Sequence, residues 1–278
     1  MKKGKFYDTY IFDFYGTLVD IHTDEQKPEL WEKMAGIYSA YGADYKPEKL
    51  KDEYSRMCKE EEKHLVKVMK VWNPDIDLKY PEIDLTRVFA RLLAEAEKTH
   101  EVKATISGKD IKLLRVEEIA QSEWAHMISN TFRVISRDKL SCYANTIKVL
   151  KTLKDNGCKA YLLSNAQASF TRSELEMVGV LPYLDGVYIS SEKQMKKPQA
   201  DFMEGLLKEF SIEKSKAVMV GNDLRSDMMI AKACGMKGIY LNTFELDNNT
   251  INAQIKELGI NKKNIQIVAD GDIGQLIK

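Results

Sequence analysis

Cysteine is scarce in this chain of 278 residues, and its four cysteines stand apart without a C-x-x-C pair. Neither a zinc site nor a disulfide framework is therefore expected. The 42 basic residues equal the 42 acidic ones, so no positive surplus favours binding to nucleic acid or to an anionic membrane. No apolar run approaches the roughly 20 residues that cross a bilayer, and the N-terminus lacks the apolar stretch of a signal peptide. These absences predict a cytoplasmic globular protein with no nucleic-acid or membrane partner.

Short apolar segments alternate with helical patterns at the beginning of the chain and over its second half. Strands are expected at 10–12, 160–163, 187–189, 217–220, 238–241 and 265–268, and helices fall between most of them. Short apolar strands that alternate with helices indicate a parallel sheet covered on both faces. The sequence therefore predicts an α/β fold with a doubly wound, Rossmann-like parallel sheet.

The middle of the chain has a different pattern. Apolar residues recur at helical spacing over 24–43 and 47–70, again from Leu85, and again over about 110–135. Pro28 and Pro47 suit the first turn of a helix, where a missing N–H costs nothing. Since no alternating β-branched run interrupts this span, it is expected to form an inserted all-helical domain. The predicted domains are a core of residues 1–20 and 145–278 and an insertion of residues 21–144.

Polar residues follow the expected strands where each one ends. They are Asp13 with Thr17, Ser164 with Asn165, Lys197, and Asp223 with Asp227. The carboxyl ends of parallel strands line a common crevice, so these residues are expected to meet in space. They supply what aspartyl-phosphate chemistry requires. A carboxylate attacks phosphorus, acidic residues and a backbone carbonyl hold Mg²⁺, and an ammonium and a hydroxyl hold the phosphate oxygens.

Four segments, in this order, resemble the motifs of the haloacid dehalogenase superfamily. They are Asp13-Phe-Tyr-Gly-Thr-Leu-Val-Asp20, Leu163-Ser164-Asn165, Lys197-Pro198 and Gly221-Asn-Asp223-x-x-x-Asp227. The insertion lies between the first and second motifs, where subfamily I of this superfamily carries its helical C1-type cap. The resemblance implies a Rossmann-like core, a helical C1-type cap and a hydrolase activity toward a small molecule.

The same resemblance implies a role for each matching residue. Asp13 is the nucleophile, Ser164 the phosphate-binding hydroxyl, and Lys197 the lysine that screens nucleophile and phosphate. Mg²⁺ is bound by Asp13, the backbone carbonyl of Tyr15, Asp223 and Asp227. Thr17 and Asn165 join Ser164 and Lys197 in the substrate-binding set, with Asn165 expected chiefly to order its loop. Lys196 is the alternative to Lys197, but the residue directly before proline is the family's position.

Two residues depart from the phosphatase pattern. Tyr15 is counted among the catalytic residues, yet it stands where most phosphatases of the superfamily have the aspartate that protonates the leaving alcohol. A phenol with a pKa of about 10 shuttles protons poorly at pH 7. Tyrosine there is typical of 2-haloacid dehalogenases, which release halide without a metal. Asn222 stands where one common variant of the fourth motif has aspartate.

These departures leave three hypotheses. The first is a Mg²⁺-dependent phosphatase of a small phosphorylated metabolite. The alternatives are a metal-independent 2-haloacid dehalogenase and a catalytically weak binding protein of the same fold. Asp20 is expected at the hinge of the insertion, or as a helix cap or turn residue. The residues that would choose the substrate belong to the insertion, so the sequence does not reveal which metabolite is bound.

Overall fold

The structure, a computed structural model, describes residues 7–278 and divides into two compact units. The core unit consists of the described residues up to Ile21, of Lys139–Ala168 and of Ser173–Lys278. The inserted unit consists of His22–Asp138 and the short segment Ser169–Arg172. Each unit has its own hydrophobic core, so each is described separately.

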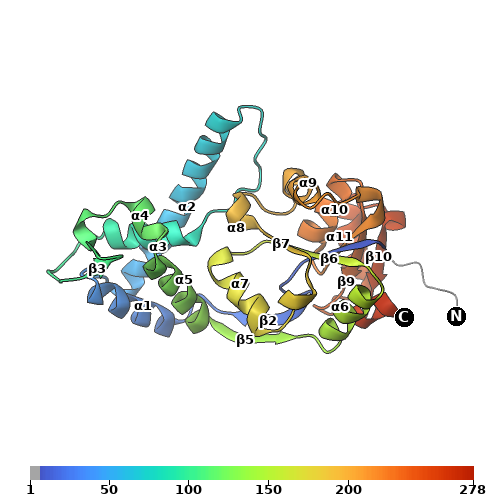
Figure 1. Ribbon diagram of the computed structural model, residues 1–278, viewed down its shortest axis with the longest axis horizontal. Helices are drawn as coiled ribbons and strands as arrows, with labels where there is room; N and C mark the ends of the chain where they lie inside the picture. Colours follow the sequence, from blue (N-terminus) through green and yellow to red (C-terminus); the bar gives the residue numbers. More distant parts are fainter. Residues whose placement is uncertain (1–6) are drawn as a thin grey trace. The chain divides into compact units, whose positions relative to one another are not determined.

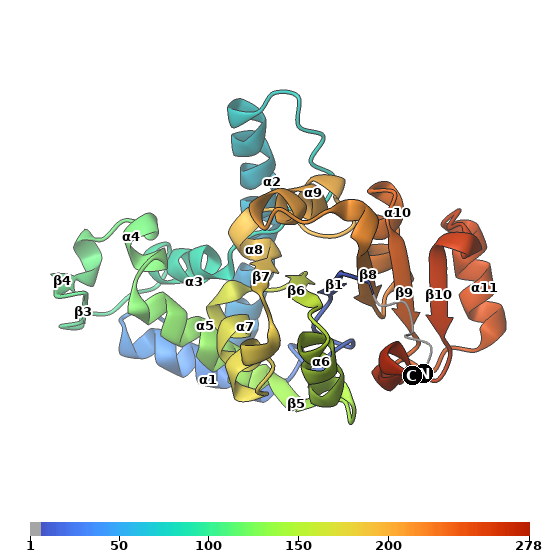
Figure 2. The same cartoon turned by 45° about the vertical axis from the view of Figure 1, so that its right-hand side comes forward.

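The core unit is built on a six-stranded parallel sheet with the strand order β10-β9-β8-β1-β6-β7 (Figures 1 and 2). The strands are β1 (Thr9–Phe12), β6 (Lys159–Ser164), β7 (Gly186–Ile189), β8 (Ala217–Gly221), β9 (Lys237–Leu241) and β10 (Ile265–Val268). Strand β1 lies in the middle, with Phe12 opposite Leu162 of β6 and Val220 of β8. All four residues of β1 are buried, and the last three form the apolar run expected of a strand covered on both faces. The predicted parallel α/β sheet is confirmed.

Helices cover both faces of this sheet. They are α6 (Thr146–Asp155), α7 (Ala168–Met177), α8 (Ser190–Lys193), α9 (Ala200–Glu209), α10 (Met229–Ala233) and α11 (Asn248–Glu257). Tyr10 and Phe12 pack in one buried cluster with Leu150 of α6. Ile11, on the opposite face of β1, packs in another with Phe202 of α9. Shorter turns join these elements, namely η2 (Leu181–Tyr183), η3 (Lys214–Lys216), η4 (Leu224–Met228), η5 (Lys262–Asn264) and η6 (Ile273–Ile277).

The inserted unit is mainly helical. Its helices are α1 (Pro28–Ala40), α2 (Pro47–Trp72), α3 (Leu85–Ala94), α4 (Val116–Ala120) and α5 (Glu123–Ser136), with the 3₁₀ turn η1 (Ile111–Leu113). Pro28 and Pro47 are the first residues of their helices, as predicted. The core of this unit includes the fully buried Tyr38, whose hydroxyl donates a hydrogen bond to the backbone oxygen of Phe89 at 3.0 Å. Its aromatic side chains therefore pack the interior of the unit.

The prediction that the insertion is all-helical was wrong. A hairpin of β3 (Thr105–Ile106) and β4 (Lys109–Asp110) precedes η1, and the helix expected over 110–135 is broken into η1, α4 and α5. A second pair of strands, β2 (Val19–Thr23) and β5 (Arg137–Cys142), forms a two-stranded ribbon. Strands β3 and β4 are only two residues long and β5 is polar and partly exposed, so these three carry no apolar alternation that would have revealed them.

The chain passes between the two units inside this ribbon, at 21–22 in β2 and at 138–139 in β5. It therefore returns to the core unit at Lys139 rather than at Asn145. Asp20 lies in β2 and forms an ion pair with Lys139 of β5, so it joins the two strands and caps no helix. Over residues 7–278, no helix is both long enough and apolar enough to cross a membrane.

Candidate active site

Asp13 directly follows β1 and is held by the neighbouring strand and by its own loop. Its backbone N–H donates to the carbonyl of Val220 at 2.9 Å, and the residue is only 7% exposed. The hydroxyl of Thr17 lies 3.1 Å from Asp13 Oδ2. The loop turns at Gly16, which has a φ of +79° that disfavours any other residue. The carboxylate is thus fixed where β1 ends.

Lys197 joins the nucleophile candidate to the fourth motif. Its ammonium lies 2.6 Å from Asp13 Oδ1 and 2.7 Å from Asp227 Oδ1, and the lysine is only 3% exposed. Asn165 holds the backbone of this lysine at two points, accepting from its N–H at 2.8 Å and donating to its carbonyl at 3.1 Å. The hydroxyl of Ser164 is 3.5 Å from Asp13 Oδ1. The structure therefore brings together residues from the ends of β1, β6 and β8 and from the loop before α9.

Burial and charge act against each other in this cluster. Burial alone would lower the pKa of the Lys197 ammonium, but the carboxylates of Asp13 and Asp227 outweigh it and raise that pKa. Burial also raises the pKa of Asp227 to about 7, with Lys197 opposing the shift and Asp13 adding to it. When all three groups are ionised, two carboxylates face one ammonium. The buried cluster then carries one net negative charge.

The two acidic residues of the fourth motif lie in different surroundings. Asp227 is 1% exposed, and its Oδ2 accepts from the backbone N–H of Asp223 at 3.0 Å. This carboxylate sits so close to Gly221 that a Cβ there would be 2.2 Å from Asp227 Oδ2. The side chain of Asp223 is exposed instead and accepts hydrogen bonds from the backbone N–H of Arg225 at 2.8 Å and from Ser226 at 2.9 Å.

Asn222, rather than Asp223, directs its side chain toward the nucleophile loop. The amide oxygen of Asn222 is 3.2 Å from the Thr17 hydroxyl, and the residue is buried. A Cβ on Gly16 would lie 2.2 Å from its amide nitrogen, so Gly16 also makes room for this side chain. The side chain of Asp223 caps the turn η4 instead, and its role as a metal ligand beside Asp13 stays a prediction.

The oxygen atoms of this site suit a hard cation such as Mg²⁺. Residues 7–278 contain no group of three or more His, Cys, Asp or Glu side chains arranged to hold a metal ion. Mg²⁺ nevertheless needs only one or two protein carboxylates, because it keeps several waters and binds substrate phosphates. Asp13 and Asp227 provide two carboxylates, and Asn222 provides an amide oxygen beside them. The donor set fits Mg²⁺ in its chemistry.

Tyr15 has a partner that the sequence did not reveal. Its phenol donates a hydrogen bond to Glu174 Oε2 at 2.5 Å. Glu174 lies on α7 and is only 2% exposed. A glutamate within an amphipathic helix is unremarkable in sequence, and none of the four motifs includes this position. Only the fold brings α7 beside the nucleophile loop.

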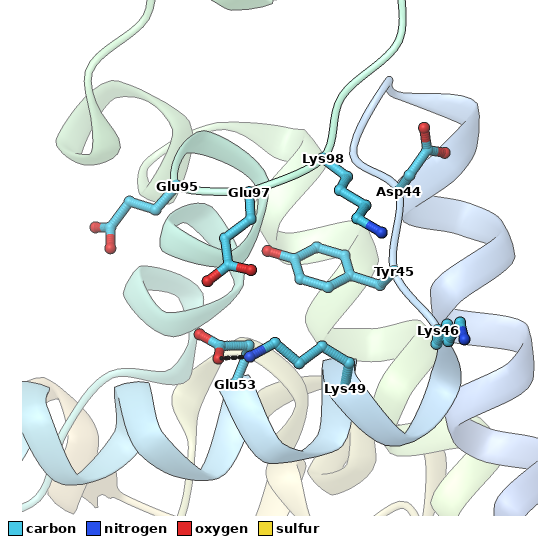
Figure 3. Close-up of a pocket in the computed structure, with 8 residues that line it drawn as sticks. All are labelled: Asp44, Tyr45, Lys46, Lys49, Glu53, Glu95, Glu97 and Lys98. Atoms are coloured by element: carbon cyan, nitrogen blue, oxygen red, sulfur yellow. Dashed lines mark ion pairs between the residues drawn. The ribbon is translucent and has the colours of Figure 1, made fainter.

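A separate cavity of about 330 Å³ lies within the inserted unit (Figure 3). It is lined by Asp44, Tyr45, Lys46, Lys49, Glu53, Glu95, Glu97 and Lys98. Its charged groups have local partners: Lys49 forms an ion pair with Glu53 at 2.8 Å, and the Asp44 carboxylate lies 2.8 Å from Nδ1 of His100. This lining resembles a solvated surface groove, and none of the predicted site residues belongs to it.

Two characterised proteins are similar to part of the chain. Over 103 residues the chain is 28% identical to pyrimidine 5'-nucleotidase PynA of Streptococcus pneumoniae. The matched segment covers 37% of this chain and 44% of that protein. Over 146 residues it is 26% identical to glyceraldehyde 3-phosphate phosphatase of Methanothermobacter thermautotrophicus, covering 52% and 62% respectively. The matches thus span about half the length of these relatives.

Structural similarity extends further along the chain than sequence similarity. The structure of a 2-haloacid dehalogenase from Pseudomonas syringae superposes with a TM-score of 0.53 at 17% identity, covering 85% of this chain and 86% of that one. At this identity the likeness concerns the fold. The family model described as haloacid dehalogenase-like hydrolase matches residues 7–235, a range that includes all four strand-end clusters. The chain is therefore a member of the haloacid dehalogenase-like hydrolases.

Proposed function

We propose that the protein is a Mg²⁺-dependent phosphatase that hydrolyses a small phosphorylated metabolite through an aspartyl-phosphate intermediate. The supporting observation is the buried carboxylate of Asp227, which shares the Lys197 ammonium with Asp13. When all three groups are ionised, two carboxylates and one ammonium leave a net negative charge that repels an anionic substrate unless a cation joins the site. When bound, Mg²⁺ supplies this positive charge and neutralises phosphate oxygens.

Each residue of the cluster has a role in this proposal. The Asp13 carboxylate attacks phosphorus, and its O–P bond forms as the bond from phosphorus to the alcohol oxygen breaks. Lys197 and Ser164 hold phosphate oxygens by charge and by hydrogen bond. Thr17 and Asn165 support these groups, because Thr17 contacts the Asp13 carboxylate and Asn165 contacts the Lys197 backbone. Water then hydrolyses the aspartyl phosphate and restores Asp13.

The metal ligands in this proposal differ from the set implied by family resemblance. Asp13 and Asp227 would hold Mg²⁺ with the amide oxygen of Asn222, while the backbone carbonyl of Tyr15 stays a predicted ligand. The inserted unit would serve as the C1-type cap that selects the substrate, since it follows the first motif in the chain. Relatives named for phosphatase activity on small phosphorylated compounds support this substrate class.

The test is hydrolysis of 4-nitrophenyl phosphate by the full chain, with Mg²⁺ and with excess chelator. Turnover should require Mg²⁺ and should disappear in Asp13→Asn, because an amide oxygen is not a nucleophile of comparable strength. The control is Asp155→Asn, an exposed position of α6 that pairs with Lys151 and belongs to none of the strand-end clusters. Full turnover by Asp13→Asn, or in chelator, would exclude the proposal.

Dehalogenation of a short 2-halo acid is the second candidate. Tyr15 favours it, since its hydroxyl hydrogen is directed to Glu174 and halide departs without a proton. The buried Asp227 argues against it, because a metal-free site with excess negative charge repels a carboxylate substrate. Incubation with 2-chloropropionate and chelator, followed by chloride release, separates the two. Chloride release without metal, and no phosphatase activity, would establish the dehalogenase.

A further inference from the structure

Glu174 lies outside the four family motifs and yet contacts one of their residues. The Tyr15 hydroxyl donates to its carboxylate at 2.5 Å, at the short end of the range for O–H···O⁻ hydrogen bonds. Both residues belong to the core unit, Tyr15 from the loop after β1 and Glu174 from α7. Glu174 is almost completely buried, so water competes little for this hydrogen bond.

A phenol has only one hydrogen to donate. While that hydrogen points at Glu174, the Tyr15 oxygen can offer only lone pairs to other groups. Redirecting it toward a leaving alkoxide requires loss of a hydrogen bond to a charged group, which costs a factor of roughly 10 to 100 in rate. Tyr15 occupies the position two residues after Asp13, on the nucleophile loop itself. Glu174 therefore controls the direction of the hydroxyl nearest in sequence to the nucleophile.

We infer that Glu174 is a positioning residue that holds the Tyr15 hydroxyl hydrogen away from the leaving group and so makes the enzyme selective for activated phosphates. These are aryl, enol and acyl phosphates, whose leaving group departs as an anion without being protonated. In the first step the O–P bond to Asp13 forms, the bond to the leaving oxygen breaks, and the electron pair stays on that oxygen. This inference rests on the proposed phosphatase activity, and it narrows the substrate class.

The experiment compares 4-nitrophenyl, phenyl and ethyl phosphates at saturating Mg²⁺ in four proteins. These are the wild type, Glu174→Gln, Tyr15→Phe and the double variant. In the wild type, kcat/KM should fall steeply from the nitrophenyl to the ethyl ester. Glu174→Gln keeps the shape of the side chain but removes the charge that attracts the hydroxyl hydrogen. It should raise the ethyl-to-nitrophenyl ratio of kcat/KM by about tenfold.

Tyr15→Phe is the matched control, because it removes the hydroxyl that Glu174 holds. It should keep the steep wild-type dependence, and the double variant should show no rise in the ratio. A merely structural role for Glu174 would lower kcat/KM for all three esters alike and leave their ratios unchanged. ¹⁹F NMR of protein containing 3-fluorotyrosine adds a readout of the contact itself. The Tyr15 resonance, identified by its loss in Tyr15→Phe, should shift in Glu174→Gln.

The outcomes separate this inference from the proposal on which it rests. If the wild type hydrolyses ethyl and nitrophenyl phosphates equally fast, the proposed phosphatase activity stands and the inferred selectivity for activated phosphates is wrong. If Glu174→Gln leaves the ethyl-to-nitrophenyl ratio of kcat/KM unchanged, Glu174 does not have the inferred positioning role. Absence of Mg²⁺-dependent turnover on every ester overturns the proposed function and the selectivity with it.

Discussion

Replacing Asp227 by asparagine should make the metal-free protein more stable while it weakens metal binding. Asp227 is buried beside a second carboxylate, and the single ammonium of Lys197 serves both. The amide of Asp227→Asn removes the excess negative charge and leaves Lys197 paired with Asp13. The site is thus expected to reduce the stability of the free enzyme for the sake of binding a cation.

The size of this effect follows from two terms of opposite sign. The pKa of Asp227 rises from 3.8 to about 7 on folding, which corresponds to about 4 kcal/mol of lost stability at pH 7. The amide NH₂ in turn cannot accept the backbone N–H of Asp223 as Asp227 Oδ2 does, which costs about 1–3 kcal/mol. Asp227→Asn should therefore raise the free energy of unfolding at pH 7 by about 1–3 kcal/mol.

The sign of the pH dependence gives an independent check. Between pH 4 and about 7 the folded state holds a proton on Asp227 that the unfolded state has released. Stability from this group is therefore greatest below its unfolded pKa and is lost as the pH rises toward about 7. Asp227→Asn lacks this loss, so the difference between its free energy of unfolding and that of the wild type should grow from pH 5 to pH 8.

Urea unfolding in excess chelator at pH 5, 6, 7 and 8 measures this difference. The matched variant Asp223→Asn, at an exposed position in the same loop, should change stability by no more than about 0.5 kcal/mol. Added Mg²⁺ should stabilise the wild type and should have much less effect on Asp227→Asn. An Asp227→Asn protein that is less stable than the wild type at pH 8 in chelator would refute the charge balance described for this site.

Three further substitutions probe the same site. Asn222→Asp adds a carboxylate beside Asp13 and should tighten apparent Mg²⁺ binding about tenfold, measured by activation of turnover. Weaker Mg²⁺ binding by this variant would show that residue 222 does not contact the metal. Lys197→Met leaves two buried carboxylates without their cation and should cost about 3–5 kcal/mol in urea unfolding with chelator, a loss that Mg²⁺ should partly restore. Tyr15→Asp should raise kcat/KM for alkyl phosphates by up to roughly 10²–10⁴-fold. If kcat/KM for ethyl phosphate does not rise, another residue supplies the proton to the leaving group.

The buried parts of the fold could be predicted well from sequence, and the exposed parts could not. Strand β1 and its neighbours were predictable because strands buried on both faces are continuously apolar. The ribbon strand β5 is polar and only partly buried, so nothing in its sequence distinguishes it from a loop. The two-residue strands β3 and β4 are too short to show any period.

The candidate site shows a similar division. Asp13, Ser164, Lys197 and Asp227 were predictable because each follows a strand or the loop after one, and their placement depends on the sheet. The choice between Asn222 and Asp223 depends on which side chain the turn η4 directs inward, and spacing alone does not decide this. Glu174 was missed for a related reason. Its importance comes from one tertiary contact between α7 and the loop after β1.

The position of β1 in the sheet has a consequence for synthesis of the protein on the ribosome. This strand emerges first, yet its partners β6 and β8 begin only at Lys159 and Ala217. At about 5–20 residues per second, β1 waits roughly 7 to 30 s for its first neighbour. Throughout that time an apolar strand with two open edges is available to other nascent chains or to chaperones. Expression yield should therefore respond to mutations in β1, and to the speed at which the inserted unit is translated, more than to changes in the late strand β10.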